Sequence, residues 1–153
     1  SVNDMKSVLC WNDYLYASRD SKELREEEQQ LAHALARLLG DLGISEAIEW
    51  KENPRVCFLS LFALGAWHWK IPIKEACLGY LWMWAENQVL AAIKLVPLGQ
   101  TDGQKILSSV IKMIPDQVST GLSLNDEEIG YTTPGQGIAS ALHETQYTRL
   151  FRS

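Results

Sequence analysis

Apolar side chains recur along most of this chain at spacings of three and four residues, which is the period of an α-helix. The clearest case follows residue 20, where leucines and polar side chains occupy opposite faces. The leucine stripe comprises Leu24, Leu31, Leu35, Leu38 and Leu42, and the polar face carries Arg25, Glu26, Glu27, Gln29 and Arg37. We predict that this amphipathic helix begins with a capping box of Asp20 and Glu23 and ends at Gly43.

A second stretch, residues 54–70, is apolar on nearly every side. Its large apolar side chains are Val56, Phe58, Leu59, Leu61, Phe62, Leu64 and Trp67. Asn53 followed by Pro54 is typical of a helix start, because asparagine caps well and proline at the first helical position loses no useful donor. A helix without a polar face needs neighbours all round, so we predict that this segment is the buried central helix of the fold.

The rest of the chain also has a helical pattern. It predicts helices over residues 4–18, 72–95, 101–114 and 136–149, with a shorter segment from Pro115 to about residue 124. Thr101 and Gln104 form a second candidate capping box. Residues 125–135 are predicted to be a long loop, and residues 150–153 a short C-terminal tail. The sequence therefore predicts an all-α fold, a single bundle of about six helices that forms one domain over residues 1–153.

Composition narrows the possible functions. Of the 153 residues, 14 are Lys or Arg and 19 are Asp or Glu, so the formal net charge is −5. This balance lacks the basic surface that nucleic acids and anionic membranes attract. The most apolar run, residues 56–69, is shorter than the roughly 20 residues of a membrane span, and no signal peptide is visible. The three cysteines form no CxxC pair, which argues against disulfides and structural zinc and favours the cytoplasm.

Two segments begin like catalytic motifs and then depart from them. Residues 99–105 resemble a phosphate-binding loop, but the glycines are too close together and Gln104 separates Gly103 from Lys105. His143 and Glu144 begin like a zinc-protease helix, yet Tyr147 stands where that motif needs its second histidine. We therefore expect no nucleotide site and no metalloprotease chemistry.

Other candidate groups have equally simple interpretations. His33 and His68 have no Cys or His at ligand spacing, and no serine or cysteine has the partners of a catalytic nucleophile. The acidic run at residues 126–128 is either a divalent-ion site or a solvated loop. We expect no catalytic residue, no bound cofactor and no metal ligand in this chain.

Three features fit a contact surface as well as a core. Four of the six tryptophans, Trp67, Trp69, Trp82 and Trp84, surround the corner at Pro72 and either pack in the core or form an aromatic contact patch. Lys94 is a lone amine in an apolar segment, which is costly unless it reaches solvent or a partner. Residues 149–153 place Leu150 and Phe151 between two arginines, so this tail docks either on a partner or on its own bundle.

Four blocks of the sequence resemble a known family. They are SRDSKELR at residues 18–25, YLWMWAENQ at 80–88, KLVPLGQTDGQ at 94–104 and HETQYTRLFRS at 143–153. Together, and in this order, they resemble the urease accessory proteins of the F type, the UreF family. The resemblance covers essentially the whole chain.

This resemblance implies a non-enzymatic, all-α chaperone that forms a homodimer and helps to insert nickel into the urease active site. Members of the family assemble with an accessory protein of the D or H type and recruit a nickel-carrying GTPase of the G type. The resulting complex engages apo-urease. A role as a GTPase-activating partner, with Arg149 or Arg152 supplied in trans, is an alternative, and a small-molecule enzyme with an all-α pocket is a third.

The resemblance also implies roles for particular residues. The D/H-type partner would contact the C-terminal run, namely His143, Glu144, Gln146, Tyr147, Arg149, Leu150, Phe151 and Arg152. Lys94, Gln100 and Thr101 would belong to a surface that faces the GTPase or lines a tunnel. The family has a further helical segment upstream that this sequence lacks, so we expect the chain to be an N-terminally truncated fragment.

Overall fold

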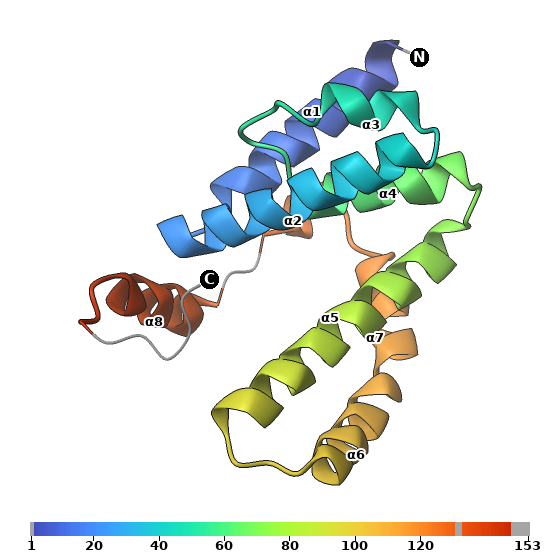
Figure 1. The fold of residues 1–153 in the computed structure, drawn as a ribbon. Helices are drawn as coiled ribbons and strands as arrows, with labels where there is room; N and C mark the ends of the chain where they lie inside the picture. Colours follow the sequence, from blue (N-terminus) through green and yellow to red (C-terminus); the bar gives the residue numbers. More distant parts are fainter. Residues whose placement is uncertain (1, 131–132, 148–153) are drawn as a thin grey trace. The chain divides into compact units, whose positions relative to one another are not determined.

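The computed structural model describes residues 2–130 and 133–147, and within these ranges the regular structure is helical, as Figure 1 shows. In chain order the elements are α1 (Val2–Ala17), α2 (Lys22–Asp41), α3 (Ser45–Glu49), α4 (Phe58–His68), α5 (Ile73–Leu95), α6 (Gln100–Ile111), α7 (Ile114–Gly121), the short 3₁₀ helix η1 (Asp126–Glu128) and α8 (Pro134–Glu144). The predicted all-α class is therefore confirmed.

The helices separate into two compact units. Unit 1 contains α1 to α4 and α8, and unit 2 contains α5, α6, α7 and η1. Each unit has its own cluster of buried apolar side chains. The organisation of residues 1–153 as one domain stays a prediction.

The core of unit 1 forms where α2 packs against α4. The side chains that α2 buries there are small or compact, namely Ala32, Ala36 and Leu39. On α4, Gly65 allows a close approach, since a Cβ atom at that position would lie 3.3 Å from Leu39 Cδ2. Leu31, Leu38 and Leu42 are 50–57% exposed, so the packing stripe of α2 is the alanine stripe beside the leucine stripe.

The start of α4 differs from the prediction. The helix begins at Phe58, because Asn53 instead closes a turn in which its Oδ1 accepts the N–H of Arg55 at 2.9 Å. α4 buries Leu61, Gly65 and Ala66, while Trp67 is 69% exposed. The prediction of a helix buried on all sides was therefore wrong for its C-terminal turn.

The ends of α2 are partly as predicted. The capping residue is Ser21, whose Oγ accepts the N–H of Leu24 at 3.2 Å, so the predicted box of Asp20 and Glu23 was wrong. Gly43 does end the helix: its φ of 92° is left-handed, and the next residue, Ile44, donates its N–H back to Leu39 O at 2.9 Å. The five-residue helix α3 was missed because one turn is too short to show a helical period.

Unit 2 is built on the long helix α5, which ends at Leu95 as predicted. Ala85 and Val89 of α5 pack against Leu107 of α6 and against Ile114 and Val118 of α7. The break near Pro115 is confirmed, since this residue lies in the first turn of α7. The predicted capping box of Thr101 and Gln104 was wrong, because the capping position is Gly99 and no side chain caps this helix.

The predicted long loop contains more structure than expected. Asn125 and Glu128 form a capping box around η1, so the acidic run belongs to a short exposed helix. The last helix begins at Pro134 and ends at Glu144, earlier at both ends than the predicted 136–149. The predicted tail, residues 150–153, lies outside the described residues.

Two glycines of unit 2 provide a matched test of the α5–α6 packing. A Cβ atom on Gly103 would lie 2.8 Å from Ile93 Cγ1, whereas nothing lies within 4 Å of one on Gly79. Alanine favours a helix over glycine by about 1 kcal/mol, and overpacking a core costs about 1–3 kcal/mol. We expect Gly79→Ala to raise the free energy of unfolding by about 0.5–1 kcal/mol and Gly103→Ala to lower it by about 1 kcal/mol.

Urea denaturation followed by circular dichroism measures both changes. Equal stabilisation by the two substitutions would contradict the close packing of α6 on α5 at Gly103.

Candidate partner-binding surface

The residues predicted to bind partners fall into two groups, one in each unit. In unit 2, Lys94 lies in the last turn of α5, and Gln100 and Thr101 are the first two residues of α6. All three side chains are exposed. A cation in the last turn of a helix interacts favourably with the partial negative charge at that end, so Lys94 stands at a position that suits a basic side chain. The structure thus places these three residues at the two ends of one short connection, residues 96–99.

Beside Lys94, α5 carries a second apolar face. The side chains of Ile73, Trp84 and Leu95 are 69%, 53% and 58% exposed. They are spaced eleven residues apart, which is close to three full helical turns, so they share one side of the helix. Ala85 and Val89, the fully packed residues, lie on the other side toward α6 and α7. This second side of α5 is therefore apolar and exposed, unlike the side that packs against α6 and α7.

The four tryptophans near Pro72 are all exposed. Trp67 and Trp69 belong to unit 1, at 69% and 51% exposure, and Trp82 and Trp84 to unit 2, at 43% and 53%. Their exposure differs from that of core side chains, and within each unit the pair offers large aromatic side chains of the kind found at interfaces. The single aromatic contact patch stays a prediction.

In unit 1, His143 and Glu144 lie in the last turn of α8 and contact the first turn of α2. His143 Nδ1 lies 2.6 Å from Glu23 Oε2, and Glu144 Oε1 accepts the backbone N–H of Lys22 at 2.6 Å. One turn earlier, the hydroxyls of Ser140 and Ser21 are 2.6 Å apart. Two of the residues predicted to bind a partner therefore hold α8 against this chain's own α2.

The remaining predicted residues follow α8. Gln146 and Tyr147 are exposed, and the Tyr147 side chain is fully so. Arg149, Leu150, Phe151 and Arg152 lie outside the described residues, so their contacts stay predictions. Sequence reasoning missed Ser21 and Glu23 as the partners of α8. Each lies about 120 positions from the residue that it contacts, so no local pattern links them.

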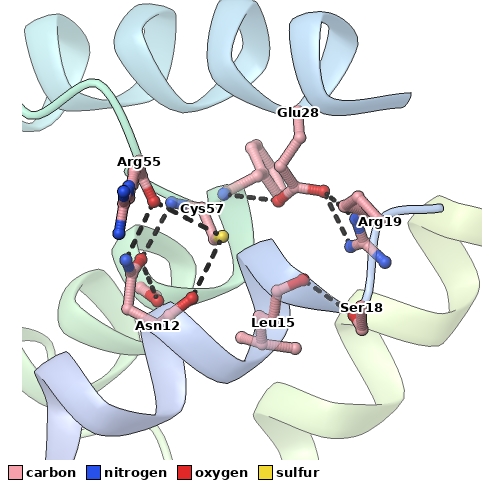
Figure 2. Close-up of polar contacts among 9 residues, drawn as sticks. Asn12, Leu15, Ser18, Arg19, Glu28, Arg55 and Cys57 are labelled. Atoms are coloured by element: carbon pink, nitrogen blue, oxygen red, sulfur yellow. Dashed lines mark hydrogen bonds and ion pairs between the residues drawn. The ribbon is translucent and has the colours of Figure 1, made fainter. Parts of the chain in front are cut away.

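A polar cluster of unit 1 joins α1 to the segment before α4, and Figure 2 shows it. Asn12, which is 1% exposed, donates its Nδ2–H to Arg55 O at 2.9 Å. Its Oδ1 accepts the N–H of Cys57 and the hydroxyl of Ser60, both at 2.9 Å. Because its amide oxygen and nitrogen are both hydrogen-bonded, the buried Asn12 side chain holds α1 against residues 55–60, and its role is structural.

A second polar contact in the same region is made by Glu28 of α2 (Figure 2). Its Oε1 accepts the N–H of Phe58 at 2.7 Å, which caps the start of α4. Its Oε2 accepts two hydrogen bonds from the Arg19 guanidinium, at 2.9 and 2.7 Å. The carboxylate thereby joins the α1–α2 connection, α2 and α4, and its hydrogen bonds are directed inward rather than toward a ligand.

The chemistry available at this cluster is limited. Burial, and secondarily the nearby Glu28 carboxylate, raises the pKa of the Cys57 thiol to about 12. The thiol is therefore protonated at neutral pH and is not a nucleophile or a metal ligand. Among residues 2–130 and 133–147, no three His, Cys, Asp or Glu side chains gather closely enough to hold a metal ion. Nor does any helix in this part of the chain have the length and apolarity to cross a membrane.

Comparison with known proteins identifies the family. The family model of UreF matches residues 1–111. The chain belongs to the UreF family. The urease accessory protein UreF of Alkalilimnicola ehrlichii is 50% identical over 151 residues, which are 99% of this chain and 66% of that protein.

Other UreF proteins are similar over the same range. That of Hahella chejuensis is 41% identical over 152 residues, covering 99% of this chain and 68% of its own length. Urease accessory protein UreF 2 of Brucella anthropi is 43% identical over 151 residues, covering 99% and 66%. This UreF chain thus spans about two thirds of the length of these relatives, and the family resemblance seen in the sequence blocks is confirmed.

The three cysteines differ enough in environment to be told apart. Cys10 is exposed, Cys77 is half-buried and Cys57 is buried with a raised pKa. We expect Cys10 to react with a thiol reagent at pH 7.5 at least tenfold faster than Cys57, because only thiolates react and only exposed ones are reached. Mass spectrometry of the alkylated peptides over time measures each rate. Labelling of Cys57 as fast as Cys10 in the folded chain would contradict the closed cluster around Asn12.

Proposed function

We propose that this chain acts in urease maturation as a scaffold for nickel-dependent assembly of the metallocentre. It would bridge a D/H-type accessory protein and the G-type GTPase, and the complex would engage apo-urease. In this proposal nickel is cargo handled by the complex, and this chain performs no catalysis of its own. The observation that carries the proposal is the 50% identity to a urease accessory protein over 99% of the chain.

The structure supports a role in protein contacts. The apolar side of α5 and the four exposed tryptophans offer large side chains of the kind that anchor interfaces. The only thiol with a clearly shifted pKa among the described residues is inert. These features favour a binding protein over an enzyme, and a homodimer and a cytoplasmic location form part of the same proposal.

The C-terminal run provides the first test. Deletion of residues 149–153, or Phe151→Ala, should abolish binding to the D/H-type protein, because a buried aromatic anchor commonly carries 2 kcal/mol or more, about a thirtyfold loss of affinity. Size-exclusion chromatography with light scattering, on the mixture of both proteins, measures complex formation. The far-UV circular dichroism should stay unchanged.

The matched control is Leu38→Ala, which removes a side chain that is 53% exposed on α2. This variant should keep full binding. A truncated chain that still forms the complete complex would remove the C-terminal run from the interface. GTP turnover by the G-type protein, measured in the same mixtures, tests the alternative in which Arg149 or Arg152 acts in trans.

The predicted partner-binding residues of unit 2, Lys94, Gln100 and Thr101, provide the second test. Lys94→Ala should lower urease activation under limiting nickel while changing the free energy of unfolding by less than about 0.5 kcal/mol, because the side chain is exposed. Lys112→Ala, at the exposed end of α6, is the control and should leave activation unchanged. Equal activation by the two variants would take Lys94 out of the proposed surface.

A further inference from the structure

Helix α8 is attached to unit 1 without a hydrophobic core. None of its residues from Pro134 to Glu144 is buried, and its two large apolar side chains, Ile138 and Leu142, are 64% and 63% exposed. A helix of eleven residues is marginal in water by itself, and helices in proteins normally gain their stability from a buried apolar face. Something other than apolar burial must therefore hold α8 in place.

What holds it is a set of polar contacts with the first turn of α2, which we call the α8 latch. Its members are Ser21, Glu23, Ser140, His143 and Glu144. Ser21 and Ser140 join their hydroxyls at 2.6 Å, and His143 Nδ1 lies 2.6 Å from Glu23 Oε2. Glu144 Oε1 accepts the N–H groups of Lys22 at 2.6 Å and of Glu23 at 3.3 Å.

The latch also completes the cap of α2. The first N–H groups of a helix have no partner inside it. Ser21 Oγ takes that of Leu24, and the Glu144 carboxylate takes those of Lys22 and Glu23. A negative charge is favourable at this end of a helix, so α2 is stabilised when α8 is docked. Close contact is possible because Gly137 faces Asp20, where a Cβ atom would lie 3.2 Å from Asp20 Cβ.

We propose that the α8 latch is a conformational device that sets whether α8 is docked on unit 1 or released as a free arm. In the docked state Ile138 and Leu142 are presented at fixed positions on unit 1, and in the released state they move with the arm. The latch is a property of this chain and is tested without any partner, so its failure would leave the proposed function standing.

Hydrogen exchange of the whole chain, followed by mass spectrometry, tests the latch. Glu144→Ala should speed exchange of the α8 amides about tenfold, which is the scale of a lost helix cap. The first turn of α2 should also exchange faster, while the amides of α4 serve as an internal standard of folding and stay unchanged. Glu49→Ala, at the exposed end of α3, is the matched control and should leave α8 as in the parent chain.

Whether Glu144→Ala speeds or slows exchange of the α8 amides distinguishes lost docking from a change in the intrinsic stability of the helix. A carboxylate at a helix C-terminus is unfavourable and alanine is the best helix former, so Glu144→Ala would slow exchange in α8 if α8 stood alone. Faster exchange thus reports lost docking. Unchanged or slower exchange, or α8 amides that already exchange at the unprotected rate in the parent chain, would overturn the proposal.

A double-mutant cycle tests the contact between Glu23 and His143 within the latch. Glu23→Gln and His143→Gln should each speed exchange in α8, and the double variant should exchange no faster than the stronger single one, because both changes remove the same contact. Effects that multiply independently would contradict a direct contact between these side chains.

Discussion

The close packing of α2 on α4 is the constraint on which unit 1 depends. It requires small side chains at Ala32 and Ala36 on one helix and Gly65 on the other, and it positions Glu28 at the first turn of α4. Because Glu28 bonds both Phe58 N and Arg19, the same packing fixes the connection between α1 and α2. Asn12 of α1 adds a further bond, to the N–H of Cys57. The α2–α4 contact is thus accompanied by polar bonds at Phe58, Arg19 and Cys57.

Much of this fold could be predicted from the sequence, and the failures have physical causes. A long helix was predicted over residues 72–95, between Pro72 and Pro97, and α5 (Ile73–Leu95) agrees with it to within one residue. The stripe of α2 was harder, because a leucine stripe and an alanine stripe lie side by side and only the distance to α4 decides which one packs. Similarly, Asn53 before Pro54 has the pattern of a helix start, but tertiary contacts of Glu28 place the start at Phe58.

The candidate surfaces were predictable only in part. The family resemblance implied a common surface for Lys94, Gln100 and Thr101. The structure places Lys94 in the last turn of α5 and the other two at the start of α6, and their role stays a prediction. The same reasoning placed His143 and Glu144 at a partner. Their contacts with Glu23 and Lys22 depend on segments about 120 positions apart, which no periodicity can reveal.

The division of the chain into units has a consequence for biosynthesis. Unit 1 is discontinuous: residues 70–129 form unit 2, and α8 follows them. At about 5–20 residues per second, a ribosome needs roughly 3–12 s to make the intervening stretch. During that interval the first turn of α2 has Ser21 as a cap but lacks the Glu144 carboxylate. Unit 1 therefore stays incompletely closed on the ribosome until α8 has been made.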